Sequence, residues 1–132
     1  SRPRVPYEDL VEEALAFGWI DSLPRKLDAE RTMLLMSPRK PGSAWSAINK
    51  ARVERMTAAG LMAPAGLAKV DRAKADGSWS ALDAVERLEV PPDLAEALAA
   101  RRGAHEHWDS FPRSTRRGVL EWITQAKRPE TR

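Results

Sequence analysis

The sequence predicts an α+β fold that is mostly helical, with about six helices packed on a short antiparallel β-hairpin. Glycine and proline divide most of the chain into segments of helical length. Only two short apolar segments, both near the N-terminus, resemble strands. The chain has 132 residues and no cysteine, which is typical of one domain whose core needs no disulfides. We therefore expect a single domain over residues 1–132.

The first helix is predicted between Pro6 and Gly18, because proline favours the start of a helix and glycine its left-handed exit. Two strands should follow, at residues 19–21 and 31–36. Pro24 interrupts the sequence between them, which predicts a loop around residues 24–29.

From residue 43 onwards the spacing of apolar residues predicts helices only. Ser43 is the expected N-cap of the next helix, because its hydroxyl can accept a first-turn amide proton. Pro64 should open a further helix that Gly77 ends, and Ser114 should cap the last one. Shorter helices are expected within residues 79–88, 91–103 and 104–111.

The composition excludes several classes of protein. The absence of cysteine excludes disulfides, thiolate zinc sites and cysteine nucleophiles. No apolar segment is long enough to span a bilayer and no signal-peptide pattern is present, so we expect a cytoplasmic protein without membrane insertion. The 22 basic and 19 acidic residues are interspersed, and a net charge of +3 argues against nucleic acid as the partner.

The sequence lacks the motifs of common catalytic and cofactor sites. The 7 glycines all occur singly, so there is no glycine-rich phosphate loop, and no nucleophile-elbow motif is present. The two histidines, His105 and His107, would point to different sides of a helix, which argues against joint metal ligation. We expect no metal and no cofactor, and the motifs leave open whether the chain is an enzyme.

Two basic segments are candidates for ligand binding. Residues 37–46 place Arg39 and Lys40 on a proline-stiffened loop before a helix, where amides and cations together could bind an anion. A purely structural connection between strand and helix explains the same residues equally well. Residues 127–132 are also basic, but cations after a helix ordinarily only compensate its dipole.

These segments resemble signatures of the YdeI/OmpD-associated proteins, a bacterial family also labelled bacteriocin-protection. Residues 7–21, 37–49 and 127–132 are similar to three signatures of the family, in the family's order. The resemblance covers essentially the whole chain. It implies a small α+β domain with an additional N-terminal strand and a C-terminal helical end that this sequence lacks. A third strand would stabilise a hairpin that is marginal by itself.

The resemblance and the loop chemistry together give nine candidate ligand-binding residues. They are Trp19, Asp21, Arg39, Lys40, Ser43, Trp45, Lys127, Arg128 and Glu130. In this hypothesis the four cations bind an anionic group, the two carboxylates orient the cations, and one of the tryptophans forms an apolar wall.

We therefore expect a non-enzymatic domain that binds a small anionic ligand, in a bacterial stress- or antimicrobial-resistance protein of the bacteriocin-protection kind. Two alternatives stay open. The first is an enzyme that uses Asp21 or Glu130 as acid or base on an anionic small substrate. The second is a protein-interaction module with a protein partner. The sequence does not determine the oligomeric state.

Overall fold

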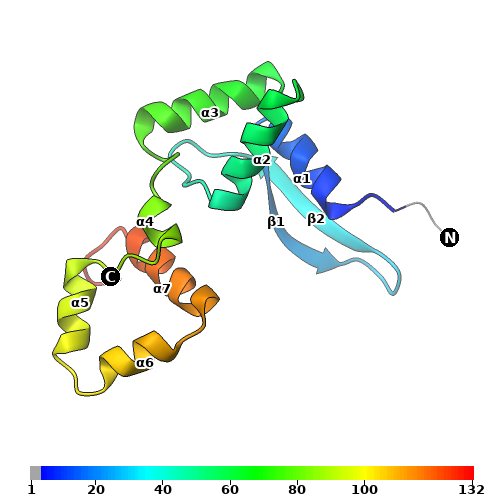
Figure 1. Cartoon of the computed structure of the whole chain (residues 1–132). Coiled ribbons are helices and arrows are strands. Elements are labelled where there is room, and N and C mark those ends of the chain that lie inside the picture. Colours follow the sequence, from blue (N-terminus) through cyan, green and yellow to red (C-terminus); the bar gives the residue numbers. More distant parts are fainter. Residues whose placement is uncertain (1–3) are drawn as a thin grey trace. The chain divides into compact units, whose positions relative to one another are not determined.

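A computed structural model describes residues 4–132, which form seven helices and two strands (Figure 1). The predicted class, α+β and mostly helical, is confirmed. The chain divides into a first unit that ends at Ala81 and a second unit, Leu82–Arg132. The elements in chain order are α1 (Tyr7–Ala16), β1 (Trp19–Lys26), β2 (Thr32–Pro38), α2 (Ala47–Ala58), α3 (Pro64–Asp76), α4 (Asp83–Glu86), α5 (Pro92–Ala99), α6 (Ala104–Ser110) and α7 (Arg113–Gln125).

The boundaries of α1 follow the prediction. Pro6 occupies the N-cap position with extended backbone, and the helix ends at Ala16, two residues before Gly18. Gly18 has a φ of +80°, a left-handed conformation in which a side chain would be strained. The chain can therefore turn directly from α1 into β1.

β1 and β2 form an antiparallel hairpin, but both strands are longer than predicted. The expected loop around residues 24–29 is wrong, because β1 continues through Pro24 to Lys26. The register shifts between Asp21 and Pro24. A proline has no N–H to donate, and such an irregularity in a two-stranded sheet accommodates it without losing a buried hydrogen bond. The third strand implied by the family resemblance stays a prediction.

The N-cap of α2 is Ser46, so the prediction of Ser43 for this role is wrong. The Ser46 hydroxyl accepts a hydrogen bond from the Asn49 amide at 3.3 Å. The chain is not yet helical at Ser43, and the Trp45 amide donates to the carbonyl of Ser78 at 3.2 Å. This non-local hydrogen bond joins the segment before α2 to the residues that follow α3.

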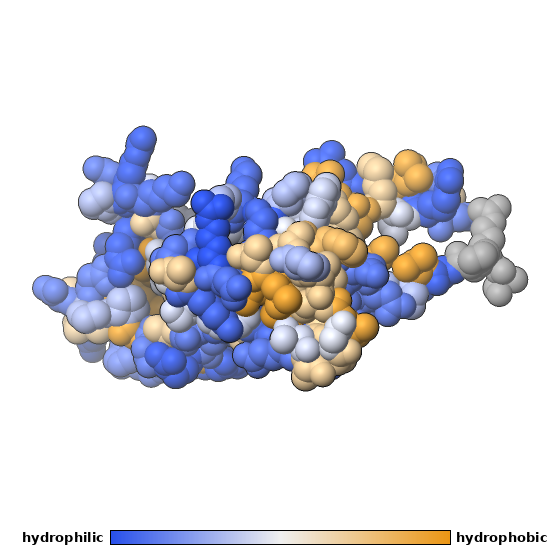
Figure 2. Space-filling view, turned by 90° about the horizontal axis from the view of Figure 1, so that it is seen from above, coloured by the Kyte–Doolittle hydropathy of each residue, from blue (hydrophilic) through white to orange (hydrophobic). Residues whose placement is uncertain are grey.

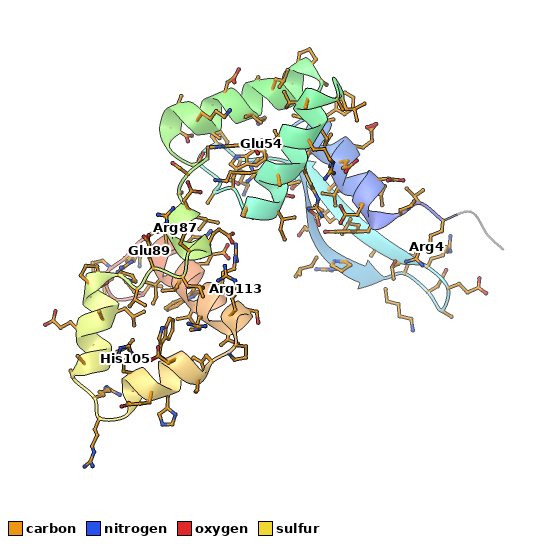
Figure 3. The ribbon with its side chains drawn as sticks, in the orientation of Figure 1. Arg4, Glu54, Arg87, Glu89, His105 and Arg113 are labelled. Atoms are coloured by element: carbon orange, nitrogen blue, oxygen red, sulfur yellow. The ribbon has the colours of Figure 1, made fainter. Side chains whose placement is uncertain are left out.

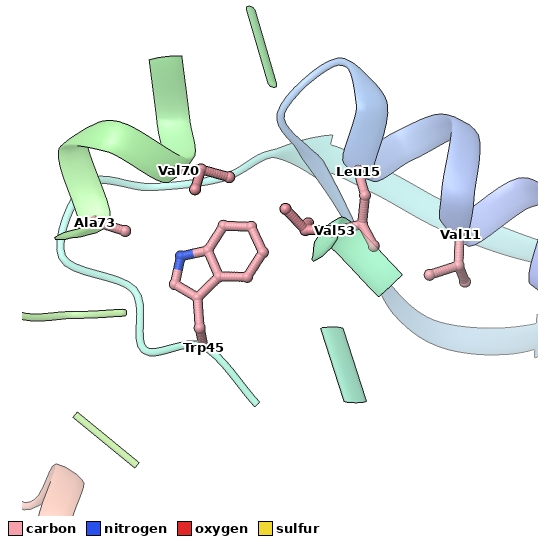
Figure 4. Close-up of a cluster of buried hydrophobic side chains, with 6 residues drawn as sticks. All are labelled: Val11, Leu15, Trp45, Val53, Val70 and Ala73. Atoms are coloured by element: carbon pink, nitrogen blue, oxygen red, sulfur yellow. The ribbon is translucent and has the colours of Figure 1, made fainter. Parts of the chain in front are cut away.

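Trp45 lies at the centre of the core of the first unit (Figure 4). Its side chain is only 2% exposed. The ring of Trp79 packs against it, with 5.0 Å between the ring centroids. The core cluster consists of Val11, Leu15, Trp45, Val53, Val70 and Ala73, with Met62 and Trp79 at its edge. Its side chains come from α1, α2, α3 and the loop before α2, so burial of one indole ties these elements together.

Two ion pairs join α2 to α1, and one close backbone contact joins α3 to α1. Arg52 and Arg55 of α2 form ion pairs with Glu8 and Glu12 respectively. On α3, Gly66 lies directly against the end of α1, because a Cβ at this position would be 2.1 Å from the carbonyl oxygen of Ala16. The absence of a side chain at residue 66 therefore allows α1 and α3 to approach each other.

In the second unit α4 packs against α7 and α5 against α6. Arg117 of α7 donates to both carboxylate oxygens of Glu86, and Arg113, labelled in Figure 3, donates to the Glu86 carbonyl. α7 begins at Arg113 with Pro112 at the N-cap, so the prediction of a Ser114 cap is wrong. The buried side chains of this unit are Leu82, Val85, Trp108, Leu120 and Ile123.

The Gly66→Ala substitution should lower the free energy of unfolding by at least about 2 kcal/mol, because the added methyl meets backbone that cannot move aside easily. Gly118→Ala is the matched control, since an added Cβ on α7 meets nothing within 4 Å. Helix propensity should make that variant up to about 1 kcal/mol more stable. Urea unfolding followed by circular dichroism measures both. Equal stability of the two variants would contradict the close contact.

Tyr7 donates a hydrogen bond to Asp21 at 2.6 Å, which joins α1 to β1. This hydrogen bond is the main reason why the pKa of Tyr7 is raised above its usual value. The neutral phenol is thus favoured in the folded state, and its stabilising contribution is lost as the pH rises through the raised pKa.

Tyr7 is the only tyrosine of the chain, so ultraviolet titration of tyrosinate reports on it alone. Asp21→Ala should lower the observed midpoint toward the usual tyrosine value, whereas Asp71→Ala on α3 should leave it unchanged. A midpoint that does not respond to Asp21→Ala argues against the Tyr7–Asp21 hydrogen bond.

Candidate anion-binding site

The candidate site is the loop between β2 and α2. The Arg39 amide donates to the carbonyl of Gly18 at 2.9 Å, which attaches the start of the loop to the end of α1. The Ser43 amide donates to the carbonyl of Lys40 at 3.2 Å and closes a turn. Within this turn Gly42 has a φ of +78°, which glycine adopts without strain. The loop therefore has a defined path on the surface of the first unit.

Arg39 is a buried cation, only 4% exposed. Its guanidinium carbon lies 3.7 Å from the centroid of the Trp45 ring, a cation–π contact, and its Nη2 donates to the Ala44 carbonyl at 2.7 Å. Nε and Nη1 are buried and have no hydrogen-bond partner among the described residues. Burial lowers the pKa of Arg39 to about 10, so the group is charged at neutral pH.

A small hollow opens between this loop and α3. Four cations, Arg39, Lys40, Lys69 and Arg72, and one carboxylate, Asp76, belong to its described lining. The centre of a water molecule has about 10 Å³ available there, which is close to the minimum for one water. The hollow is therefore lined by an excess of positive charge, and its volume matches that of one small group.

Asp76 positions the wall of the hollow. Its Oδ1 accepts hydrogen bonds from the Ser78 amide at 2.8 Å and the Ser78 hydroxyl at 2.5 Å. These bonds lower the pKa of Asp76, and a bond from the Gly42 amide adds a smaller effect. The carboxylate thus connects the end of α3 to the loop. A second connection comes from Lys69 of α3, whose Nζ donates a hydrogen bond to the Arg39 carbonyl at 2.8 Å.

The structure brings four of the nine predicted residues together around this hollow: Arg39, Lys40, Ser43 and Trp45. Sequence reasoning missed the wall that α3 and the following residues supply. The one available signal is the i, i+3 spacing of Lys69 and Arg72, which puts two cations on one side of a helix. The lining residues missed are Lys69, Arg72, Asp76 and Ser78.

Trp19 and Asp21 do not line the hollow. Trp19, 42% exposed, lines a separate apolar groove beside α1. Asp21 accepts the hydrogen bond from Tyr7 described above. Both residues are at the start of β1, but their neighbours in the structure differ from the cations that the sequence hypothesis assigned to them.

The other three predicted residues, Lys127, Arg128 and Glu130, are exposed in the second unit after α7. Their participation in the same site stays a prediction. The tail contains an ordered cation that sequence reasoning missed, because Arg132 donates to both carboxylate oxygens of Asp93 and to the carbonyl of Ile123. Three of the six tail residues are basic, and nothing in the sequence indicates that Arg132 rather than Lys127 or Arg128 forms an ion pair.

The described residues contain no group of three or more histidine, aspartate or glutamate side chains that could hold a metal ion. His105 of α6, labelled in Figure 3, lies 3.9 Å from a carboxylate oxygen of Asp109. No helix within residues 4–132 combines the length and the apolar character that crossing a membrane requires.

Comparison with known proteins gives two family matches, one in each part of the chain. Residues 87–132 match the family described as "Bacteriocin-protection, YdeI or OmpD-Associated", which confirms the resemblance over about a third of the chain. No curated protein and no solved structure matches the chain. Residues 1–69, which contain the hairpin, the loop with Arg39 and the start of α3, match a domain of unknown function, DUF8412. This match covers 69 of the 132 residues, and the chain belongs to the DUF8412 family.

Proposed function

We propose that the chain is an anion-binding domain of a bacteriocin-protection-like protein, and that the anion binds at the hollow beside Arg39. The observation that carries this proposal is a buried guanidinium with two nitrogens that have no hydrogen-bond partner, and with no ion-pair partner, among the described residues. A buried charge costs several kcal/mol of desolvation unless an opposite charge compensates it. A cation–π contact and one carbonyl compensate only part of that cost.

The distribution of charges around the hollow supports the same conclusion. Lys40 and Arg72 are exposed at its edge, where they can contact an anion from solvent. Arg39 lies beneath them and contributes a positive potential that water screens weakly. The lining contains four cations and only one carboxylate, Asp76, so it retains an excess of positive charge.

The size of the hollow limits the ligand class. Space for about one water molecule suits a single small anion, or one oxygen of a terminal phosphate or carboxylate whose remaining atoms stay in solvent. An enclosed nucleotide or sugar does not fit.

Inorganic phosphate is the first probe, at constant ionic strength. It should raise the thermal midpoint of the wild-type chain, because a ligand that binds only the folded state stabilises it. Lys40→Gln with Arg72→Gln removes both exposed donors and should weaken phosphate binding in isothermal titration at least about tenfold.

Lys74→Gln is the matched control for this experiment. Lys74 also belongs to α3, but it lies over the ring of Trp79 and outside the described lining of the hollow. It should retain wild-type affinity. A wild-type chain that responds to phosphate no more than to matched chloride, or a control that weakens as much as the double variant, contradicts the proposal.

Arg39→Met separates a binding role of Arg39 from a structural one. Methionine fills similar space without a charge, and apolar replacement of buried charges is often neutral or stabilising. We expect a free energy of unfolding within about 1 kcal/mol of wild type or above it, together with loss of the phosphate response. Urea unfolding and titration measure the two effects. Destabilisation by more than about 3 kcal/mol would instead assign Arg39 a structural role.

A further inference from the structure

We propose that the first unit has a second binding surface, a groove beside α1 that binds a basic amphipathic helix of a partner protein. The lining consists of Leu10, Glu13, Ala14, Phe17, Trp19 and Met36, around a volume of about 380 Å³. We call this surface the α1 groove. The inference is independent of anion binding, because the α1 groove and the hollow have no lining residue in common.

The floor of the α1 groove is apolar and accessible. Leu10, Phe17 and Trp19 are 37%, 56% and 42% exposed. Leu10, Ala14 and Phe17 recur at intervals of four and three residues, so they form one stripe along α1 and its C-cap. Such a stripe complements the apolar face of another helix.

Apolar exposure is concentrated in the first unit. Of the fourteen large hydrophobic residues exposed in the described part of the chain, twelve precede Ala81. Seen from above, hydrophobic side chains gather on the surface of this unit, right of centre in the view (Figure 2). Contiguous exposed apolar surface commonly marks a site of protein interaction.

Charge indicates what kind of partner fits. α1 has two acidic stripes, each with carboxylates four residues apart. Glu8 and Glu12 are neutralised by the arginines of α2 described above. Asp9 and Glu13 are exposed and have no ion-pair partner within residues 4–132, and Glu13 belongs to the α1 groove. Like charges four residues apart destabilise a helix slightly, so an opposing cation would be favourable.

The ion pairs of the first acidic stripe indicate which groups would pair with the second stripe. Arg52 and Arg55, three residues apart on α2, pair with the stripe of Glu8 and Glu12. By the same chemistry, the partner helix should place lysine or arginine residues three or four apart opposite Asp9 and Glu13. Its adjacent apolar face would cover Leu10 and Phe17. Recognition of an amphipathic helix in a groove uses this combination of apolar anchors and charged rim.

The test uses the whole chain and two synthetic peptides of about 15 residues, long enough for partial helicity. One contains leucine at helical spacing and lysine elsewhere, and the other has glutamate in place of lysine. Binding is followed by titration calorimetry. The lysine peptide should bind with an affinity that falls as salt rises, and the glutamate peptide should not bind.

Variants determine where the peptide binds. Asp9→Asn with Glu13→Gln should weaken the lysine peptide about threefold to tenfold, as expected for two exposed ion pairs. Phe17→Ser should weaken it as well, because it removes an apolar anchor without changing charge. The matched control is Glu54→Gln with Glu106→Gln, which changes the net charge equally at exposed residues outside the α1 groove. Glu54 is labelled on α2 in Figure 3.

Four results would overturn the proposal. The first is equal binding of both peptides, which indicates unspecific apolar adsorption. The second is equal weakening by the control pair, which indicates attraction to net charge alone. The third is self-association of the wild-type chain in sedimentation equilibrium that Phe17→Ser prevents, since a second copy would then occupy the α1 groove. Absence of any peptide binding also counts against it.

Discussion

The burial of the Trp45 indole, with the Arg39 guanidinium stacked on one of its faces, is the interaction on which the first unit depends. The indole is the centre of a core to which α1, α2 and α3 each contribute. The guanidinium covers one face of that indole and bonds to the Ala44 carbonyl just before it in the chain. One cation therefore completes the core and also forms the base of the proposed anion site. A chain that replaced it with an apolar residue would keep the core and lose the charge.

Local sequence signals predicted the helix boundaries that depend on the backbone alone. α1 lies between Pro6 and Gly18, and α3 lies between Pro64 and Gly77, because proline fixes φ and glycine accepts positive φ wherever they occur. The start of α2 was missed. Ser43 has the chemistry of an N-cap, but Ser46 takes that role. The Trp45 amide between them donates to the carbonyl of Ser78, which is 33 positions further along the chain than Trp45.

The same distinction applies to the candidate site. The cations of the loop could be predicted together because they are neighbours in sequence, and the loop holds them at the hollow. Lys69 and Arg72 could not be predicted, because their position depends on how α3 packs against α1. That packing relies on Gly66, which nothing in the sequence distinguishes from the other isolated glycines. The tail residues Lys127 and Arg128 were included only through the family resemblance.

The hollow and the α1 groove share one segment of backbone. Phe17 and Trp19 line the groove, and Gly18 between them accepts the hydrogen bond from the Arg39 amide. The aliphatic chain of Lys69 lies against Gly18, and its ammonium donates to the Arg39 carbonyl. A partner that shifts residues 17–19 therefore acts on the backbone that positions the buried cation. Linkage makes such an effect reciprocal, so an anion that fixes Arg39 changes the affinity of the groove by the same factor. The two proposed binding surfaces, which have no side chain in common, are thus connected through one glycine carbonyl.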